Sequence, residues 1–173
     1  TYGWEWNWTS KTNFYLDKNL VGGGVLLDSG SHIIDLVLFL LGDCVKFNYY
    51  ETTGIYGPDI LEDEVNIELK MKEGYWGKIC NSRIRTLENS LKIVGEKGFI
   101  EINLASPTKA KFFIRDYKEC QSGSAIDLSS PINPYENQIL DMISDIKNNN
   151  RRDFGETFKQ SVSLIEKMYN YGK

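Results

Sequence analysis

The pattern of apolar and polar positions is most distinctive at residues 22–41, which read GGGVLLDSGSHIIDLVLFLL. From 33 to 41 every residue except Asp35 is hydrophobic, and this predicts a helix that is buried nearly all round. Asp28, His32 and Asp35 follow each other at i, i+4 and i+7, so helical geometry places them in one narrow stripe. Because the helix is expected to be buried, this stripe is expected to be buried too and to need hydrogen-bonding partners.

Gly42 ends this apolar run in the manner of a helix C-cap, and segments with strand-like composition follow it. The turn sequences at residues 72–74 and 96–98 favour antiparallel hairpins. Residues 119–131 are rich in Ser and Gly and predict a surface loop. The expected strands are residues 45–53, 64–72, 75–83, 90–95, 99–104 and 109–116, and the alternating residues Trp4, Trp6 and Trp8 predict a further short one.

Two amphipathic helices are expected at the end of the chain, one from Pro134 to the asparagine run at 148–150 and one over residues 155–171. The predicted apolar face of the first carries Ile139, Met142, Ile143 and Ile146. The predicted core face of the second carries Phe158, Val162, Ile165 and Tyr169. The expected fold class is α+β, a mainly antiparallel open sheet with helices on one face, in a single domain over residues 1–173.

Composition agrees with a globular domain, because 41% of the 173 residues are hydrophobic and 25% are charged. The net charge of -4 comes without basic clusters, which disfavours nucleic acid and anionic membranes as partners. No apolar run approaches the roughly 20 residues that span a bilayer. Cys44, Cys80 and Cys120 are odd in number and widely spaced, which fits neither a zinc site nor a disulfide framework and favours a reducing, cytoplasmic setting.

The candidate chemistry lies in the polar stripe, since a carboxylate beside an imidazole suits proton transfer. In the competing interpretation, Asp28 only caps the helix and His32 is a hydrogen-bonded interior residue. The consecutive acids Glu62, Asp63 and Glu64 invite a metal site, but neighbouring residues on a strand point to opposite faces and form a poor ligand cage. No metal site is therefore expected.

The glycine run followed by VLLDSGSHIID resembles the opening of the C-terminal domain of the glucose-fructose oxidoreductase / inositol dehydrogenase / MocA (Gfo/Idh/MocA) family. Residues 61–63, the segment LKIVGEKGFIEI at 91–102 and the ending from Pro134 onward resemble that family in the expected order. The resemblance therefore covers nearly the whole chain.

The resemblance implies a domain that binds a sugar, polyol or related hydroxylated substrate against an N-terminal Rossmann domain holding NAD or NADP. It implies Asp28 and His32 as the catalytic carboxylate and histidine, whereas Asp35 is expected to be structural. Lys11 and Lys18 are candidate substrate contacts. The family's catalytic lysine lies in the Rossmann domain, and no lysine here matches it. The chain has no G-x-G-x-x-G motif, so no cofactor-binding residue is expected in it.

The sequence thus predicts the substrate-binding and assembly half of an NAD(P)-dependent oxidoreductase, inactive without its Rossmann domain. The alternative is a non-catalytic binding or scaffold domain of the same fold. By resemblance, a homo-oligomer formed through the sheet is also expected, with exposed apolar side chains of residues 64–83 as the place to look.

Overall fold

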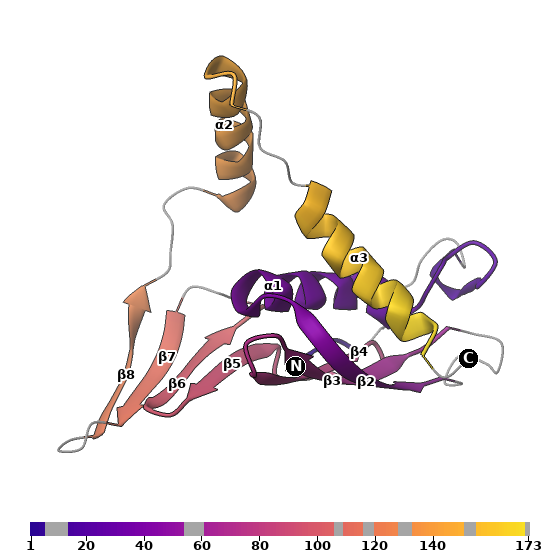
Figure 1. Cartoon of the computed structure of the whole chain (residues 1–173), viewed down its shortest axis with the longest axis horizontal. Coiled ribbons are helices and arrows are strands. Elements are labelled where there is room, and N and C mark those ends of the chain that lie inside the picture. Colours follow the sequence, from indigo (N-terminus) through magenta and orange to yellow (C-terminus); the bar gives the residue numbers. More distant parts are fainter. Residues whose placement is uncertain are drawn as a thin grey trace. The chain divides into compact units, whose positions relative to one another are not determined.

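The computed structural model describes residues 1–5, 14–53, 61–105, 109–115, 120–127, 133–150 and 155–171. The chain divides into two compact units, the first made of residues 1–88 and 155–173 and the second of residues 89–154. Figure 1 shows the helices and strands of both. The two units are described separately below.

The first unit is built on a four-stranded sheet with strand order β1-β4-β3-β2. Its strands are β1 (Tyr2–Gly3), β2 (Cys44–Thr52), β3 (Glu64–Met71) and β4 (Trp76–Ser82). The pairs β2/β3 and β3/β4 are antiparallel, which confirms the hairpin predicted at residues 72–74, and β1 runs parallel to β4. Of the expected strand with alternating tryptophans, Trp4 is exposed, and Trp6 and Trp8 lie outside the described residues.

The alternation predicted along β3 is confirmed, and it shows which face of the sheet is covered. Val65, Ile67, Leu69 and Met71 are all buried. Helices α1 (Ser31–Leu41) and α3 (Gly155–Tyr169) pack against each other over one face of this sheet (Figure 1). The hydrophobic core of the unit therefore lies between this face of the first sheet and the two helices.

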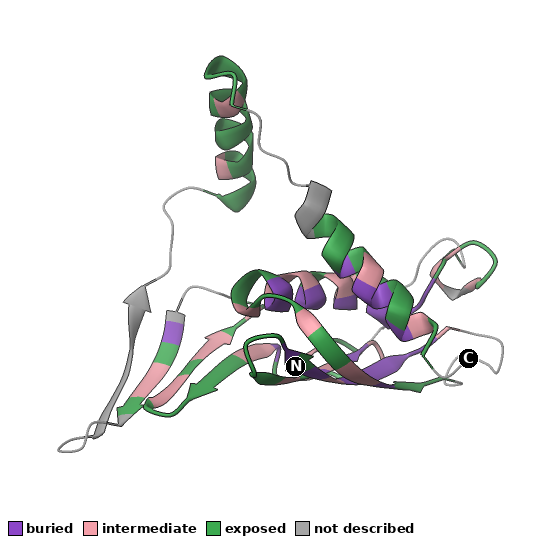
Figure 2. Cartoon of the chain, viewed as in Figure 1, coloured by how far each residue is buried: buried purple, intermediate pink, exposed green. Residues whose placement is uncertain are grey.

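The prediction that the first helix is buried nearly all round is wrong. Ile33, Ile34, Val37 and Leu38 are buried, but Phe39 is 76% exposed, because the sheet and α3, among the described elements, cover only part of the helix surface. Figure 2 shows buried positions of α1 interspersed with intermediate ones. The predicted cap is confirmed: Gly42 has φ 78°, and its N–H donates to the carbonyl of Leu38 at 2.9 Å.

The predicted core face of α3 is wrong in part. The residues that it buries are Ser161, Leu164, Ile165 and Met168, whereas Phe158 and Val162 are exposed. Ser161 belongs to this buried face because its hydroxyl donates to Asp35 on α1, with 2.7 Å between the two oxygens. A pattern that counts apolar residues cannot include a serine buried by a hydrogen bond.

The second unit holds a four-stranded antiparallel sheet in the order β5-β6-β7-β8, and helix α2 (Pro134–Lys147). Its strands are β5 (Ser90–Gly95), β6 (Gly98–Asn103), β7 (Lys109–Arg115) and β8 (Cys120–Asp127). The hairpin predicted at residues 96–98 is confirmed. The loop predicted over residues 119–131 is wrong where β8 forms, because the backbone pairs with β7 whatever the Ser and Gly content of its side chains.

Helix α2 begins as predicted, since the Asn133 side chain caps it by accepting from the N–H of Tyr135 at 2.9 Å. Its apolar residues are exposed in the described part of the chain (Figure 2); those on the predicted face are Ile139, Met142, Ile143 and Ile146. The α+β class is confirmed, with the strands divided between two sheets. None of the described helices is long and apolar enough to cross a membrane.

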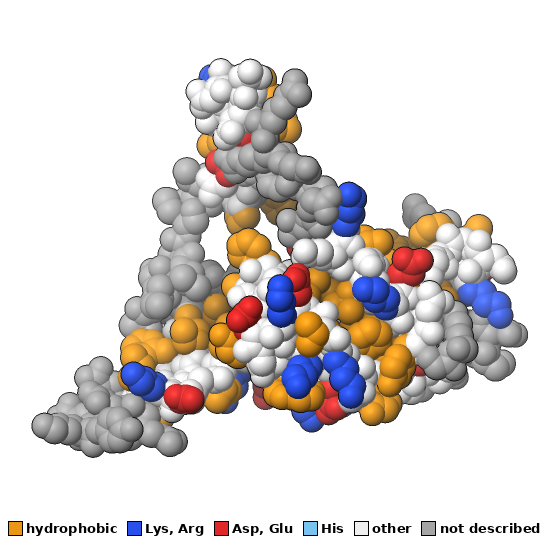
Figure 3. Space-filling view, viewed as in Figure 1, with side chains coloured by type: hydrophobic (Ala, Val, Ile, Leu, Met, Phe, Trp, Pro, Cys, Tyr) orange, Lys and Arg blue, Asp and Glu red, His pale blue; other side chains and the backbone are white. Residues whose placement is uncertain are grey.

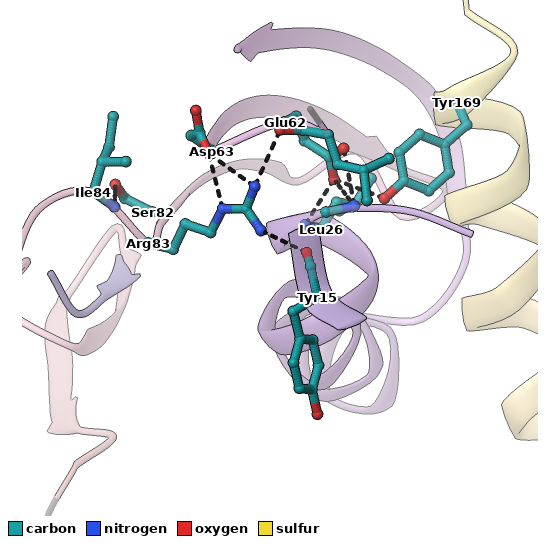
Figure 4. Close-up of polar contacts among 10 residues, drawn as sticks. Tyr15, Leu26, Glu62, Asp63, Ser82, Arg83, Ile84 and Tyr169 are labelled. Atoms are coloured by element: carbon teal, nitrogen blue, oxygen red, sulfur yellow. Dashed lines mark hydrogen bonds and ion pairs between the residues drawn. The ribbon is translucent and has the colours of Figure 1, made fainter. Parts of the chain in front are cut away.

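Two ion pairs fix the segment where β3 begins. The carboxylate of Asp63 is fully buried; its Oδ1 accepts from Nε of Arg83 at 2.9 Å and forms an ion pair with Nη2 of the same guanidinium at 2.8 Å (Figure 4). Next to it, Glu64 accepts from Nε and Nη2 of Arg85 at 2.6 and 2.8 Å, and these bonds hold the pKa of Glu64 below its usual range. Such two-point contacts fix geometry as well as charge.

We expect Arg83→Met to destabilise the first unit by about 3–5 kcal/mol, because it leaves the buried carboxylate of Asp63 without its cation. Urea unfolding followed by circular dichroism measures the change. Lys78→Met is the matched control, since the Lys78–Glu68 pair at 2.9 Å lies on the surface and should contribute little. Equal effects of the two substitutions would contradict the prediction.

Candidate functional site

The predicted catalytic pair lies where the chain changes from one helical geometry to another. Asp28 belongs to a π-helical turn, η2 (Leu26–Gly30), and His32 to the first turn of α1. The sequence did not predict the π-turn, which is a rare geometry often found at functional sites. Both residues are exposed, so the expectation of a buried stripe is wrong for them.

The exposure of this pair also contradicts the competing structural interpretation. Neither helical segment has a side-chain N-cap, so Asp28 does not cap the helix, and His32 is not an interior residue. The local contact at this point is from the Ser31 hydroxyl to the backbone carbonyl of Asp28, at 2.9 Å. The carboxylate and the imidazole thus face solvent on adjoining turns, where a ligand could reach them.

The other predicted contacts are less informative. Lys18 is exposed in the turn that follows η1 (Phe14–Leu16), and Lys11 lies outside the described residues. Asp35, expected to be structural, accepts from Ser161 and so joins α1 to α3. Among the residues that the structure describes, no group of three or more His, Cys, Asp or Glu could hold a metal ion.

Beneath the π-turn lies a buried carboxylate that the sequence interpretation missed. Glu62 is 3% exposed, and its two oxygens accept from the N–H of Gly24 at 3.0 Å each. Its Oε1 also accepts from the N–H of Leu26 at 3.1 Å and from the hydroxyl of Tyr169 at 2.7 Å. Figure 4 shows the carboxylate of Glu62 directed at Leu26 and Tyr169, which come from opposite ends of the chain.

Glycine is required at this contact because the backbone comes so close to Glu62. A Cβ at Gly24 would lie 2.8 Å from Oε2 of Glu62, and one at Gly23 would overlap the hydroxyl of Tyr169 and lie 2.9 Å from Cβ of Leu27. Neither position has room for a side chain. The glycine run therefore lets the chain pass close against Glu62 and Tyr169 on its way into the π-turn.

Burial shifts the titration of this cluster. It raises the pKa of Glu62, although the hydrogen bonds from Tyr169, Leu26 and Gly24 act in the opposite direction. Burial, followed by the nearby charge of Glu62, raises the pKa of Tyr169 as well. The phenol therefore keeps its proton at neutral pH and remains the donor in its bond with Glu62.

A second buried group, Asn81 on β4, holds the far side of the turn. It is fully buried, and its Nδ2 donates to the carbonyl of Tyr2 and to the hydroxyl of Ser29, both at 3.0 Å. A Cβ at Gly30 would lie 2.9 Å from Oδ1 of Asn81. The π-turn is thus fixed to the sheet by Asn81 and to the start of β3 by Glu62.

Figure 3 shows lysine and arginine side chains interspersed with aspartate and glutamate over the described part of the visible face. The described side chains on this face therefore form no extended patch of one charge.

Comparison with known proteins extends this picture. A family model described as the GFO/IDH/MocA C-terminal domain matches residues 1–101. No curated protein sequence matches the chain. Aldose-aldose oxidoreductase from Caulobacter crescentus, in a crystal structure with glycerol, is similar with a TM-score of 0.76 and 22% identity, covering 98% of this chain and 50% of that one.

Two further solved structures are similar at lower identity. Levoglucosan dehydrogenase in complex with NADH and L-sorbose has a TM-score of 0.78 and 18% identity, covering 98% of this chain and 54% of that one. UDP-N-acetylglucosamine 3-dehydrogenase GnnA from Acidithiobacillus ferrooxidans has a TM-score of 0.66 and 15% identity, covering 80% and 44%. The chain thus spans about half the length of these proteins, and the likeness is one of fold. With the family model covering more than half of its residues, the chain belongs to the GFO/IDH/MocA C-terminal domain family.

Proposed function

We propose that the chain is the C-terminal, substrate-binding half of an NAD(P)-dependent oxidoreductase that acts on a sugar, polyol or related hydroxylated small molecule. The observation that carries the proposal is the exposed pair of Asp28, on a π-turn whose backbone is held by buried groups, and His32, in the first turn of α1 that follows it. Family membership supports it, as do the sugar oxidoreductases and dehydrogenases among the similar structures.

In this proposal the chain contributes proton transfer. The neutral imidazole of His32 accepts the proton of a substrate hydroxyl during oxidation, and returns it during reduction. Asp28, four residues earlier in the chain, is the carboxylate that orients the imidazole in this proposal. Substrate binds over these two residues, which are therefore the proposed catalytic residues.

The glycine run of this chain does not fit the phosphates of a dinucleotide. Phosphate-binding glycine loops leave their backbone N–H groups free to face the ligand. Here the N–H of Gly24 is bonded to Glu62, and the space beside Gly23 and Gly24 is filled by Tyr169 and Glu62. We therefore assign cofactor binding, and with it hydride transfer, to an N-terminal Rossmann domain, and expect this chain alone to be inactive.

We also assign the protein to a reducing, cytoplasmic setting. Cys44 and Cys80 are free thiols, and burial raises the pKa of both, which keeps them protonated and weakly reactive. Free thiols are typical of a reducing compartment, so Cys44 and Cys80 support a cytoplasmic setting.

The coding region upstream of Thr1 separates this proposal from a binding or scaffold domain of the same fold. We expect it to encode a strand followed by G-x-G-x-x-G and, further on, a lysine in a Glu-Lys-Pro-like segment. Sequencing the region checks this directly. An initiator codon immediately before Thr1 would contradict the oxidoreductase proposal and favour the scaffold alternative.

In the protein with its Rossmann domain, His32→Ala should lower kcat by about 10²–10⁴-fold, because the proton acceptor is lost. Cofactor-linked assays with a panel of sugars and polyols measure the change, and circular dichroism confirms that the variant folds. The matched control is Asp43→Asn, which alters an exposed carboxylate just beyond the other end of α1. Unchanged turnover in His32→Ala would refute the catalytic assignment.

We propose further that the protein forms a homo-oligomer through a sheet. The strand register places only apolar residues and glycine on one face of β5, β6 and β7; its larger members are Leu91, Ile93, Ile100, Ile102, Phe112 and Ile114. By contrast, β3 turns Asn66 and Lys70 outward, and the exposed large hydrophobic residues described between 64 and 83 are Tyr75 and Trp76. The second sheet is therefore the better candidate for contact with another copy.

Ile93→Lys should convert the oligomer to a smaller species, since Ile93 is 40% exposed on the apolar face and a lysine there would be buried on association. Analytical ultracentrifugation measures the mass. Val94→Lys is the matched control, because Val94 is more exposed than Ile93 and points to the opposite face of the sheet. A monomeric parent chain, or equal effects of both substitutions, would overturn this assignment.

A further inference from the structure

We propose that Glu62 is the positioning residue of the site: its buried carboxylate holds the π-turn that carries Asp28 and leads to His32. This inference rests on the proposed function for the meaning of the site. The contacts that support it, from Gly24, Leu26 and Tyr169 to one carboxylate, stand independently of any activity.

The contact supplies what the beginning of a helix lacks. The first N–H groups of a helix have no partner within it, and a neighbouring side chain usually caps them. Here no local side chain does so, and the N–H groups of Gly24 and Leu26 donate instead to Glu62, which lies 38 and 36 residues further along the chain. The backbone carbonyl of Glu62 also accepts from the N–H of Val25 at 3.1 Å. The start of the turn is therefore fixed by the segment that precedes β3.

The same carboxylate connects the turn to the end of the chain. The Tyr169 hydroxyl donates to the oxygen of Glu62 that also accepts from Leu26. The ring of Tyr169 lies edge-on to that of Tyr49 on β2, with 6.5 Å between the ring centroids. Helix α3 and the sheet thus limit the movement of Glu62, and Glu62 limits the movement of the turn.

Glu62 acts through the turn, not on substrate. At 3% exposure it is covered by the glycine run and by Tyr169, so a ligand over Asp28 and His32 does not reach it. Loss of the hydrogen bonds to Glu62 should increase the local opening of the π-turn more than the opening of the rest of the unit. A group that contributed only to global stability would instead loosen all parts of the unit together.

Amide hydrogen exchange and histidine NMR on the labelled chain separate these two roles. His32 is the chain's only histidine, so its ring gives an unambiguous signal. The amide of Leu26 reports on the turn, and that of Ile67, buried in the middle of β3, reports on global stability. The variants are Glu62→Gln and the milder Tyr169→Phe, which removes one hydrogen bond without removing a charge.

The matched control is Glu64→Gln, which alters a buried acid two residues away whose partner is Arg85 and not the turn. In Glu62→Gln and Tyr169→Phe we expect exchange at Leu26 to accelerate about tenfold more than at Ile67, as fits the loss of one hydrogen bond to a charged group. We also expect the His32 ring signal to shift. The control Glu64→Gln should change neither the difference in exchange between Leu26 and Ile67 nor the His32 ring signal.

Equal acceleration at Leu26 and Ile67, or an unshifted His32 signal, would overturn the inference. If Glu62→Gln does not fold, Tyr169→Phe decides by the same two measurements. Neither measurement involves turnover, so failure here is distinguishable from failure of the proposed function, which the activity of His32→Ala tests.

Discussion

The burial of three consecutive carboxylates is the constraint on which the first unit depends. Glu62, Asp63 and Glu64 are 3%, 0% and 9% exposed, and each carboxylate taken out of water must be compensated. The three cannot share a partner, because successive side chains at the start of a strand point in different directions. Glu62 accepts from backbone N–H groups and a phenol, and its two neighbours each accept from an arginine. The π-turn, α3 and the segment after β4 therefore all contact residues 62–64.

This requirement explains features that no single helix or strand would need. The glycine run is required because its backbone comes close to Glu62. Tyr169 on α3 donates a further hydrogen bond to the same carboxylate. Among the described residues, no buried side-chain nitrogen or oxygen lacks a hydrogen-bond partner. A polar network satisfied in this way is rigid and specifies one arrangement, whereas a partly satisfied one would be costly. A stiff support for the π-turn follows from the same bonds that keep the acids buried.

The sequence pattern predicted those parts of the fold that local chemistry decides. Turn residues identified the hairpins, alternation identified the covered face of β3, and Gly42 marked the end of α1. The pattern did not predict features that depend on contacts with residues far away in the sequence. The π-turn depends on Glu62, which lies more than 30 residues away, and the buried face of α3 includes Ser161 because of Asp35. The burial of Asp63 and Glu64 was not predicted either, although Arg83 and Arg85, which follow β4 in the same hairpin, were a usable signal for their partners.

The contrast between exposed and buried acids bears on how the site works. Asp28 and His32 lie in solvent, where each side chain alone would sample many orientations, and a proton acceptor is effective only when held within hydrogen-bond reach of its substrate. Glu62 and Asn81 fix the backbone from which both side chains project, one from the side of β3 and the other from β4. The reactive groups thus remain accessible while their anchors are buried. Under the proposed function, a substrate-binding half that meets a separate cofactor domain would need this combination, because the geometry of the pair would have to exist before the two halves meet.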